Sequence, residues 1–114
     1  MTIEQSEVGA VAVLRMEGDI DEAGVDTLRE AMLGCISSSR FNIVMNLSRV
    51  RFISYMGLGV LVERLRKVRA CGGDIKLVGV NLYTERLFRM VGVTSLFETY
   101  TSEPQALRVY QEAA

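Results

Sequence analysis

The sequence has no histidine and no tryptophan, and it contains only one proline and two cysteines in 114 residues. Histidine is the commonest general base and the commonest metal ligand in proteins, so its absence argues against both a histidine-dependent catalytic site and a metal centre. Cys35 and Cys71 have no CxxC spacing and are expected to be free thiols in the core or at a helix end. The residues therefore imply no metal and no cofactor.

The chain also lacks a long hydrophobic run. Its longest uncharged stretch, residues 52–62, has 11 residues, whereas a helix that spans a bilayer needs about 20. No signal peptide precedes the first strand-like segment, and two cysteines make no disulfide framework. We therefore expect a single domain over residues 1–114, without membrane insertion and located in the cytoplasm.

The charges balance to a net of −1 but are unevenly distributed. Residues 1–30 carry eight acids and two bases, whereas residues 40–89 carry ten bases and three acids. This polarity either steers a charged partner or reflects segments that face one another or water.

Hydrophobic periodicity predicts an α/β fold. Alternating apolar residues on both sides of Gly9 predict a hairpin of two strands, and short apolar runs predict strands at residues 41–47, 74–80 and 96–100. Stripes with helical spacing follow Asp21 (Val25, Leu28, Met32, Cys35) and the central turn (Leu58, Leu61, Leu65, Val68). Two further helices begin near Asn81 and Ser102, the second with a capping box formed by Ser102 and Gln105. The order is β-β-α-β-α-β-α-β-α, which implies a mixed, mostly parallel β-sheet with four α-helices.

Several residues suggest a binding surface or a reaction, but each has a simpler explanation. Gly57 and Gly59 lack the third glycine of a GxGxxG fingerprint because position 62 is valine, and no GK[ST] motif is present. Close packing of a helix start against the sheet explains these glycines, and a nucleotide-binding domain is the alternative. Ser54 and Tyr55 have no histidine to activate them, so no catalytic residue is predicted and the protein is not expected to be an enzyme.

Charged residues flank this turn on two segments. Asp19 and Asp21 are either paired carboxylates or a helix cap with a solvated neighbour. The basic residues of the second helix are a solvated face, a docking surface for an acidic protein, or a contact with nucleic acid; they comprise Arg64, Arg66, Lys67 and Arg69. No aromatic residue is interleaved among them and the pI is near 5.5, so we expect no nucleic-acid partner.

Taken together, these segments resemble the single-domain STAS family of bacterial anti-sigma factor antagonists. The resemblance covers nearly the whole chain and rests on five segments in order: VAVLRMEGDID, NIVMNLSRVRFISYMGLGVL, GGDIKLVGV, ERLFRMVGVTSLFE and SEPQAL. It implies the STAS fold, a regulatory role without catalysis, and docking onto an anti-sigma factor of the kinase-ATPase type, which frees a sigma factor. In the family that kinase phosphorylates a serine or threonine at the start of the second helix, and the added charge breaks the complex.

This chain departs from the family at the phosphorylated position. Where the family usually has Asp-Ser-Ser/Thr-Gly, the chain has Ser54-Tyr55-Met56-Gly57. Met56 has no hydroxyl group and cannot accept phosphate. Ser54 and Tyr55 are the remaining, displaced candidates for phosphorylation. The resemblance thus predicts that the docking surface is kept while the switch at Met56 is lost.

The partner interface that we predict combines the first helix entry with the start of the second helix. It comprises Asp21, Ser54, Tyr55, Met56, Gly57, Leu58 and Arg64, the last on the exposed side of the second helix. The alternative to docking is that Met56 packs into the core. A scaffold subunit of a stressosome-like or transporter-ATPase complex is an alternative function. The oligomeric state, the sigma factor and the upstream signal cannot be read from the sequence.

Overall fold

The computed structural model describes residues 1–113 and has the element order predicted from the sequence. Five strands form one sheet in the order β1-β2-β3-β4-β5, with β1 and β2 antiparallel and the other neighbours parallel. The elements are β1 (Thr2–Val8), β2 (Val11–Glu17), α1 (Glu22–Ser37), β3 (Asn42–Arg49), α2 (Tyr55–Ala70), β4 (Asp74–Val78), α3 (Leu82–Val91), β5 (Glu98–Tyr100) and α4 (Glu103–Ala113).

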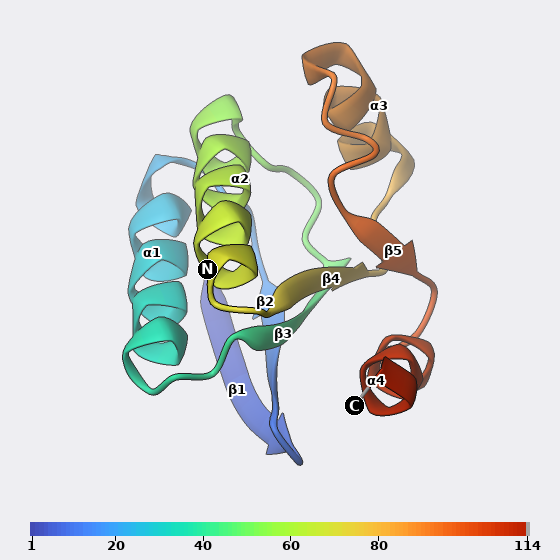
Figure 1. The fold of residues 1–114 in the computed structure, drawn as a ribbon. Coiled ribbons are helices and arrows are strands. Elements are labelled where there is room, and N and C mark those ends of the chain that lie inside the picture. Colours follow the sequence, from blue (N-terminus) through green and yellow to red (C-terminus); the bar gives the residue numbers. More distant parts are fainter. Residues whose placement is uncertain (114) are drawn as a thin grey trace.

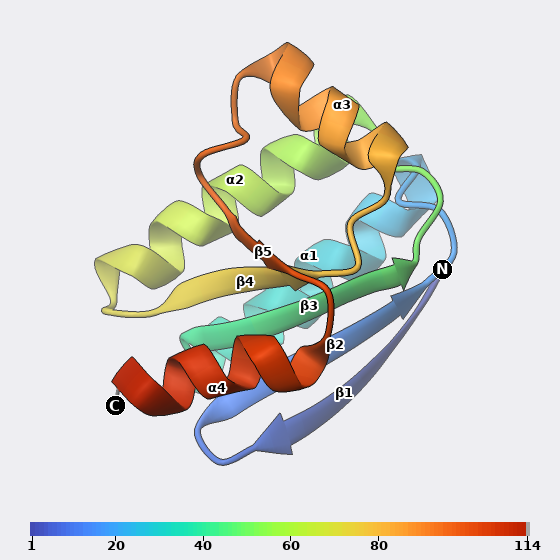
Figure 2. The same ribbon diagram turned by 90° about the vertical axis from the view of Figure 1, so that its right-hand side faces the viewer.

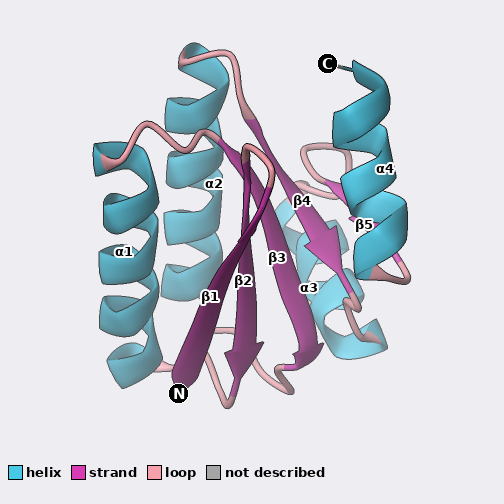
Figure 3. Ribbon diagram, turned by 90° about the horizontal axis from the view of Figure 1, so that it is seen from below, coloured by secondary structure: helices cyan, strands magenta, loops and turns pink. Residues whose placement is uncertain are grey.

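The sheet lies between two unequal layers of helices. Helices α1 and α2 cover one face, α4 covers the other, and α3 lies above the β5 edge of the sheet (Figures 1 and 2). Figure 3, seen from below, separates the layers clearly. Strand β3 occupies the centre of the sheet, so its residues are buried on both faces and read in sequence as a continuous apolar run.

The larger core lies under α1 and α2, and both predicted helical stripes are part of it. Each of the stripe residues is at most 2% exposed: Val25, Leu28, Met32, Cys35, Leu58, Leu61, Leu65 and Val68. The rings of Phe88 and Phe97 extend this core to α3, with their centroids 5.7 Å apart. Phe97 is buried in this core, and the last strand begins at Glu98 rather than at residue 96 as predicted.

Helix ends follow the capping chemistry of the sequence, with one correction. Asp21 caps α1 and Asn81 caps α3, whose end at Gly92 is left-handed (φ 82°). The predicted capping box of α4 is incomplete, because the Gln105 side chain accepts from Thr101 N–H (3.1 Å) rather than from Ser102. The cysteines lie as expected, Cys35 buried and Cys71 at the C-cap of α2. No helix within residues 1–113 is long and apolar enough to cross a membrane.

Helix α4 is fastened to the sheet by polar contacts. The Tyr110 hydroxyl lies 2.7 Å from the Asp74 carbonyl oxygen and 2.8 Å from that of Ile43. Lys76 is only 5% exposed, pairs with Asp74 and Glu98, and lies 4.6 Å from the centre of the Tyr110 ring. These contacts hold α4 on the face of the sheet opposite α2.

A bidentate ion pair makes this attachment sensitive to acid. Arg15 donates two hydrogen bonds of 2.9 Å to Glu103, and Asn46 donates a third of 2.7 Å. The Arg15 hydrogen bond lowers the pKa of Glu103 below its ordinary 4.5. A depressed pKa gives stability that is present above pH 4.5 and is lost as the pH falls through the lower pKa of the folded state.

We therefore expect the free energy of unfolding to fall with acid more steeply in the wild type than in Glu103→Gln, measured by urea unfolding at a series of pH values. Parallel pH curves would contradict this.

Candidate functional site

The candidate site lies where the carboxyl ends of β2 and β3 meet. Because the two strands are parallel neighbours, the loops that follow them leave the same edge of the sheet and feed α1 and α2. A bridge between Ile20 and Ile53 joins the loops: Ile20 N–H donates to the Phe52 carbonyl (2.8 Å), and Ser54 N–H donates to the Ile20 carbonyl (2.9 Å). The bridge holds the starts of α1 and α2 together. It thereby brings Asp21 and Ser54, the N-caps of the two helices, to the same edge of the sheet although α1 and β3 separate them in the sequence.

Both cap residues use their side chains locally. Asp21 Oδ1 accepts from Gly24 N–H at 2.9 Å, and Ser54 Oγ accepts from Gly57 N–H at 3.0 Å. Asp19 and Asp21 were expected to be either paired carboxylates or a helix cap with a solvated neighbour. The structure shows that Asp21 is a helix cap. The hydroxyl of Ser54 stabilises the first turn of α2, and no base lies among its hydrogen-bond partners.

Gly57 is the position at which this turn requires the absence of a side chain. A Cβ there would lie 2.7 Å from Ile20 Cγ2 and 3.1 Å from Ile53 Cγ1. The prediction of close packing is thus confirmed for Gly57. It is wrong for Gly59, where a Cβ would meet no atom within 4 Å. Gly59 lies on the outer surface of α2, so packing within this chain does not explain it.

Three of the predicted interface residues are on the surface. Asp21 is exposed, and Tyr55 and Met56 are 65% and 56% exposed. The alternative that Met56 packs into the core is therefore excluded. Ser54 is partly buried.

The other three predicted interface residues, Gly57, Leu58 and Arg64, are buried or largely buried. Gly57 and Leu58 are buried, so they support the surface from below. The expectation that Arg64 lies on the exposed side of α2 is wrong. Its side chain is 12% exposed, Arg64 pairs with Glu63 at 3.2 Å, and its Nε is buried without a hydrogen-bond partner among residues 1–113. Little of the Arg64 side chain is therefore accessible to a partner.

Sequence reasoning missed a set of exposed apolar residues next to Tyr55. Phe52, Tyr83, Met90 and Val91 are 38%, 53%, 75% and 45% exposed, and the rings of Phe52 and Tyr83 lie 6.0 Å apart. The sequence of α3 could have revealed this surface. Its buried residues are Thr84, Leu87 and Phe88, whereas Tyr83 and Met90 are apolar residues outside these positions. Apolar residues out of phase with a buried stripe indicate a surface that contacts something else.

The start of the chain packs against this site. Gly18, which follows β2, has a φ of 113°, and a Cβ there would lie 3.1 Å from the Cα of Met1. Gly18 N–H also donates to the Arg49 carbonyl at 3.1 Å, so the turn after β2 is held from both sides. Figure 2 shows the N-terminus beside the loops that lead into α1 and α2.

Within residues 1–113, no cluster of three or more His, Cys, Asp or Glu side chains could hold a metal ion. The groups with shifted pKa values that fasten α4 lie on the other face of the sheet, and burial raises the pKa of the Cys35 thiol inside the core. What the site presents is a mostly apolar surface around Tyr55 and Met56.

A family model for the STAS domain matches residues 2–106. The chain belongs to the STAS family. The anti-sigma F factor antagonist of Paenibacillus polymyxa is 29% identical over 108 residues, which cover 94% of this chain and 92% of that one. The crystal structure of an anti-sigma factor antagonist from Mycobacterium paratuberculosis has a TM-score of 0.84 at 25% identity, covering 95% and 92% of the two chains. The phosphorylated form of the Bacillus cell fate determinant SpoIIAA has the same STAS fold, with a TM-score of 0.75 at 23% identity and coverage of 95% and 99%.

Proposed function

We propose that this STAS protein is an anti-sigma factor antagonist, a regulatory protein that acts by binding. Its partner is an anti-sigma factor of the kinase-ATPase type. The support is the family membership together with relatives of nearly equal length that carry this function in their names. The docking surface is formed by Asp21, Ser54, Tyr55 and Met56, with Gly57 and Leu58 beneath it.

The observation that carries the regulatory part of the proposal is the position of Met56. Its side chain is 56% exposed in the first turn of α2, directly after the Ser54 cap and Tyr55. A thioether there is an apolar and adaptable contact that no kinase can phosphorylate. We infer that binding is kept at this surface and that phosphorylation does not end it.

An affinity pull-down from the native cell lysate, with captured proteins identified by mass spectrometry, tests the function. Recovery of an anti-sigma factor with a kinase-ATPase domain is the expected result. Recovery of transporter-ATPase or stressosome proteins without an anti-sigma factor would reject the function and favour the scaffold role. Calorimetric titration with ATP and GTP separates the nucleotide-binding alternative, which requires tight, magnesium-dependent binding.

Phosphorylation is tested directly on the same preparation. Protein purified from its native cells is expected to show the intact mass of the unmodified chain, because Met56 has no acceptor and Ser54 Oγ caps α2. A stoichiometric phosphate on Ser54 or Tyr55, located by peptide sequencing, would refute the loss of the switch.

A further inference from the structure

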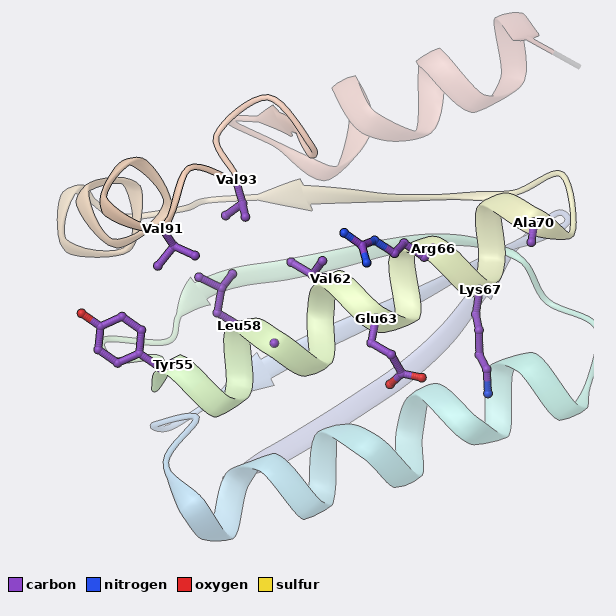
Figure 4. A pocket seen from close by; sticks show the side chains of 10 residues that line it. Tyr55, Leu58, Val62, Glu63, Arg66, Lys67, Ala70, Val91 and Val93 are labelled. Atoms are coloured by element: carbon purple, nitrogen blue, oxygen red, sulfur yellow. The ribbon is translucent and has the colours of Figure 1, made fainter.

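Two apolar grooves meet at the Tyr55 side chain. The first, of about 570 Å³, follows α2 from Tyr55 to Ala70, with Val91 and Val93 as its opposite wall. Figure 4 shows Val91 and Val93 facing Leu58 and Val62 across this groove. The second, of about 360 Å³, lies between the start of α2 and α3; its lining includes Phe52, Tyr55, Tyr83, Arg86 and Met90.

The two grooves are joined at Tyr55, and Met56 is the next residue of α2. Tyr55 lines both grooves and precedes Met56 in the first turn of α2. Met90 and Val91, at the rim of the grooves, are 75% and 45% exposed and do not belong to the hydrophobic core. A contiguous apolar surface of this kind on a small domain marks a site of interaction with another molecule.

The charges that line the grooves are mainly positive. They are Arg66 and Lys67 in the first groove, Arg86 in the second, and Glu63 as the one acid. Glu63 is already paired with Arg64. Arg66, Lys67 and Arg86 form no ion pair with any of residues 1–113, whereas Arg40 and Arg49, elsewhere on the protein, pair with Glu7 and Glu17. The patch therefore offers apolar hollows beside three cations available to a partner's acids.

We propose that the two grooves bind an acidic amphipathic helix of the anti-sigma factor. This inference rests on the proposed function and names the partner segment that it uses. At about 1.5 Å per residue, α2 between Tyr55 and Ala70 is roughly 22 Å long, which matches a partner helix of about 15 residues. Apolar side chains on one face of that helix enter the grooves on the two sides of Tyr55, and its acids face Arg66, Lys67 and Arg86.

Variants on the groove that lie away from Met56 test the proposal. Met90→Asp and Arg86→Glu are each expected to weaken binding of the captured anti-sigma factor about tenfold or more, measured by biolayer interferometry. Both positions are exposed, so folding is expected to be kept, and circular dichroism checks it. Gln111→Asp, an exposed change of similar charge on α4, is the matched control and is expected to bind like the wild type.

A photo-crosslinking amino acid at position 90 identifies the bound segment. The expected crosslink is to an anti-sigma factor peptide with apolar residues at helical spacing and neighbouring Asp or Glu residues. A crosslink to a basic or extended peptide, or to a second copy of this chain, would overturn the proposal. So would wild-type binding to vesicles of mixed phosphatidylcholine and phosphatidylserine that is lost in Met90→Asp, because it would assign the patch to a lipid surface.

The outcomes distinguish failure of the proposed function from failure of the proposed docking site. If wild type captures an anti-sigma factor and Met90→Asp and Arg86→Glu bind it equally well, the proposed function stands and the groove is not the docking site. If wild type captures no anti-sigma factor, the proposed function fails, and the helix-binding role fails with it.

Discussion

Replacing Met56 with glutamate is expected to weaken binding to the anti-sigma factor by about 2–4 kcal/mol, roughly 30- to 1,000-fold. The Met56 side chain stands exposed beside Tyr55 and is expected to be covered in the complex. In the complex, a carboxylate at this position would have to be buried against apolar surface without a partner. The variant thereby imitates the charge that phosphorylation would add.

Two controls make this result interpretable. Met56→Leu keeps the volume and the apolar character and is expected to stay within about 1.5 kcal/mol of wild type. Gln111→Glu adds the same charge on the far face of the sheet and is expected to bind normally. Isothermal titration calorimetry against the purified anti-sigma factor measures all three. Equal affinity of Met56→Glu and Met56→Leu would place Met56 outside the interface.

Replacing Gly57 with valine is expected to lower the free energy of unfolding by about 3 kcal/mol. The new Cβ would lie 2.7 Å from Ile20 Cγ2, and the two γ-methyl groups add further volume between Ile20 and Ile53. Relief requires the Ile20–Ile53 bridge to open, so the caps of α1 and α2 would separate. We expect partner affinity to fall together with stability.

The same substitution two residues later is the matched control. Gly59→Val is in the same helix and meets no atom within 4 Å of its Cβ, so its free energy of unfolding is expected to stay within about 0.5 kcal/mol of wild type. Urea unfolding followed by circular dichroism measures both variants. Similar losses at the two positions would show that contact with Ile20 does not determine the cost.

The helices could be predicted from the sequence because their apolar residues recur with the period of an α-helix. The stripes from Val25 to Cys35 and from Leu58 to Val68 repeat every three or four residues, so the helices and their buried faces could be predicted. Asn81 and the pair Asp19 and Asp21 could be named as candidate caps, because the chemistry of a helix start is local. The order of strands and helices then implied the parallel sheet.

The groove and the position of Arg64 could not be predicted in this way. Which residues line a groove depends on where α3 lies relative to α2, and that placement comes from Phe88 and Phe97, which are brought together by folding. Arg64 looked exposed because charged residues usually are, and only the packing of the folded chain reveals that its side chain is 12% exposed. Periodicity predicts which face is buried and does not predict how deep a polar side chain lies.

The packing of Met1 on Gly18 has a practical consequence for anyone who handles this protein. A purification tag or a fused domain joined ahead of Met1 would emerge beside Gly18 and the loops that lead into α1 and α2, where it would compete with an incoming partner. The last turn of α4 lies at the opposite end of the sheet and on its other face, which makes it the attachment point that leaves the binding surface free (Figure 2). Immobilisation through the two ends of the same chain would therefore yield different apparent affinities.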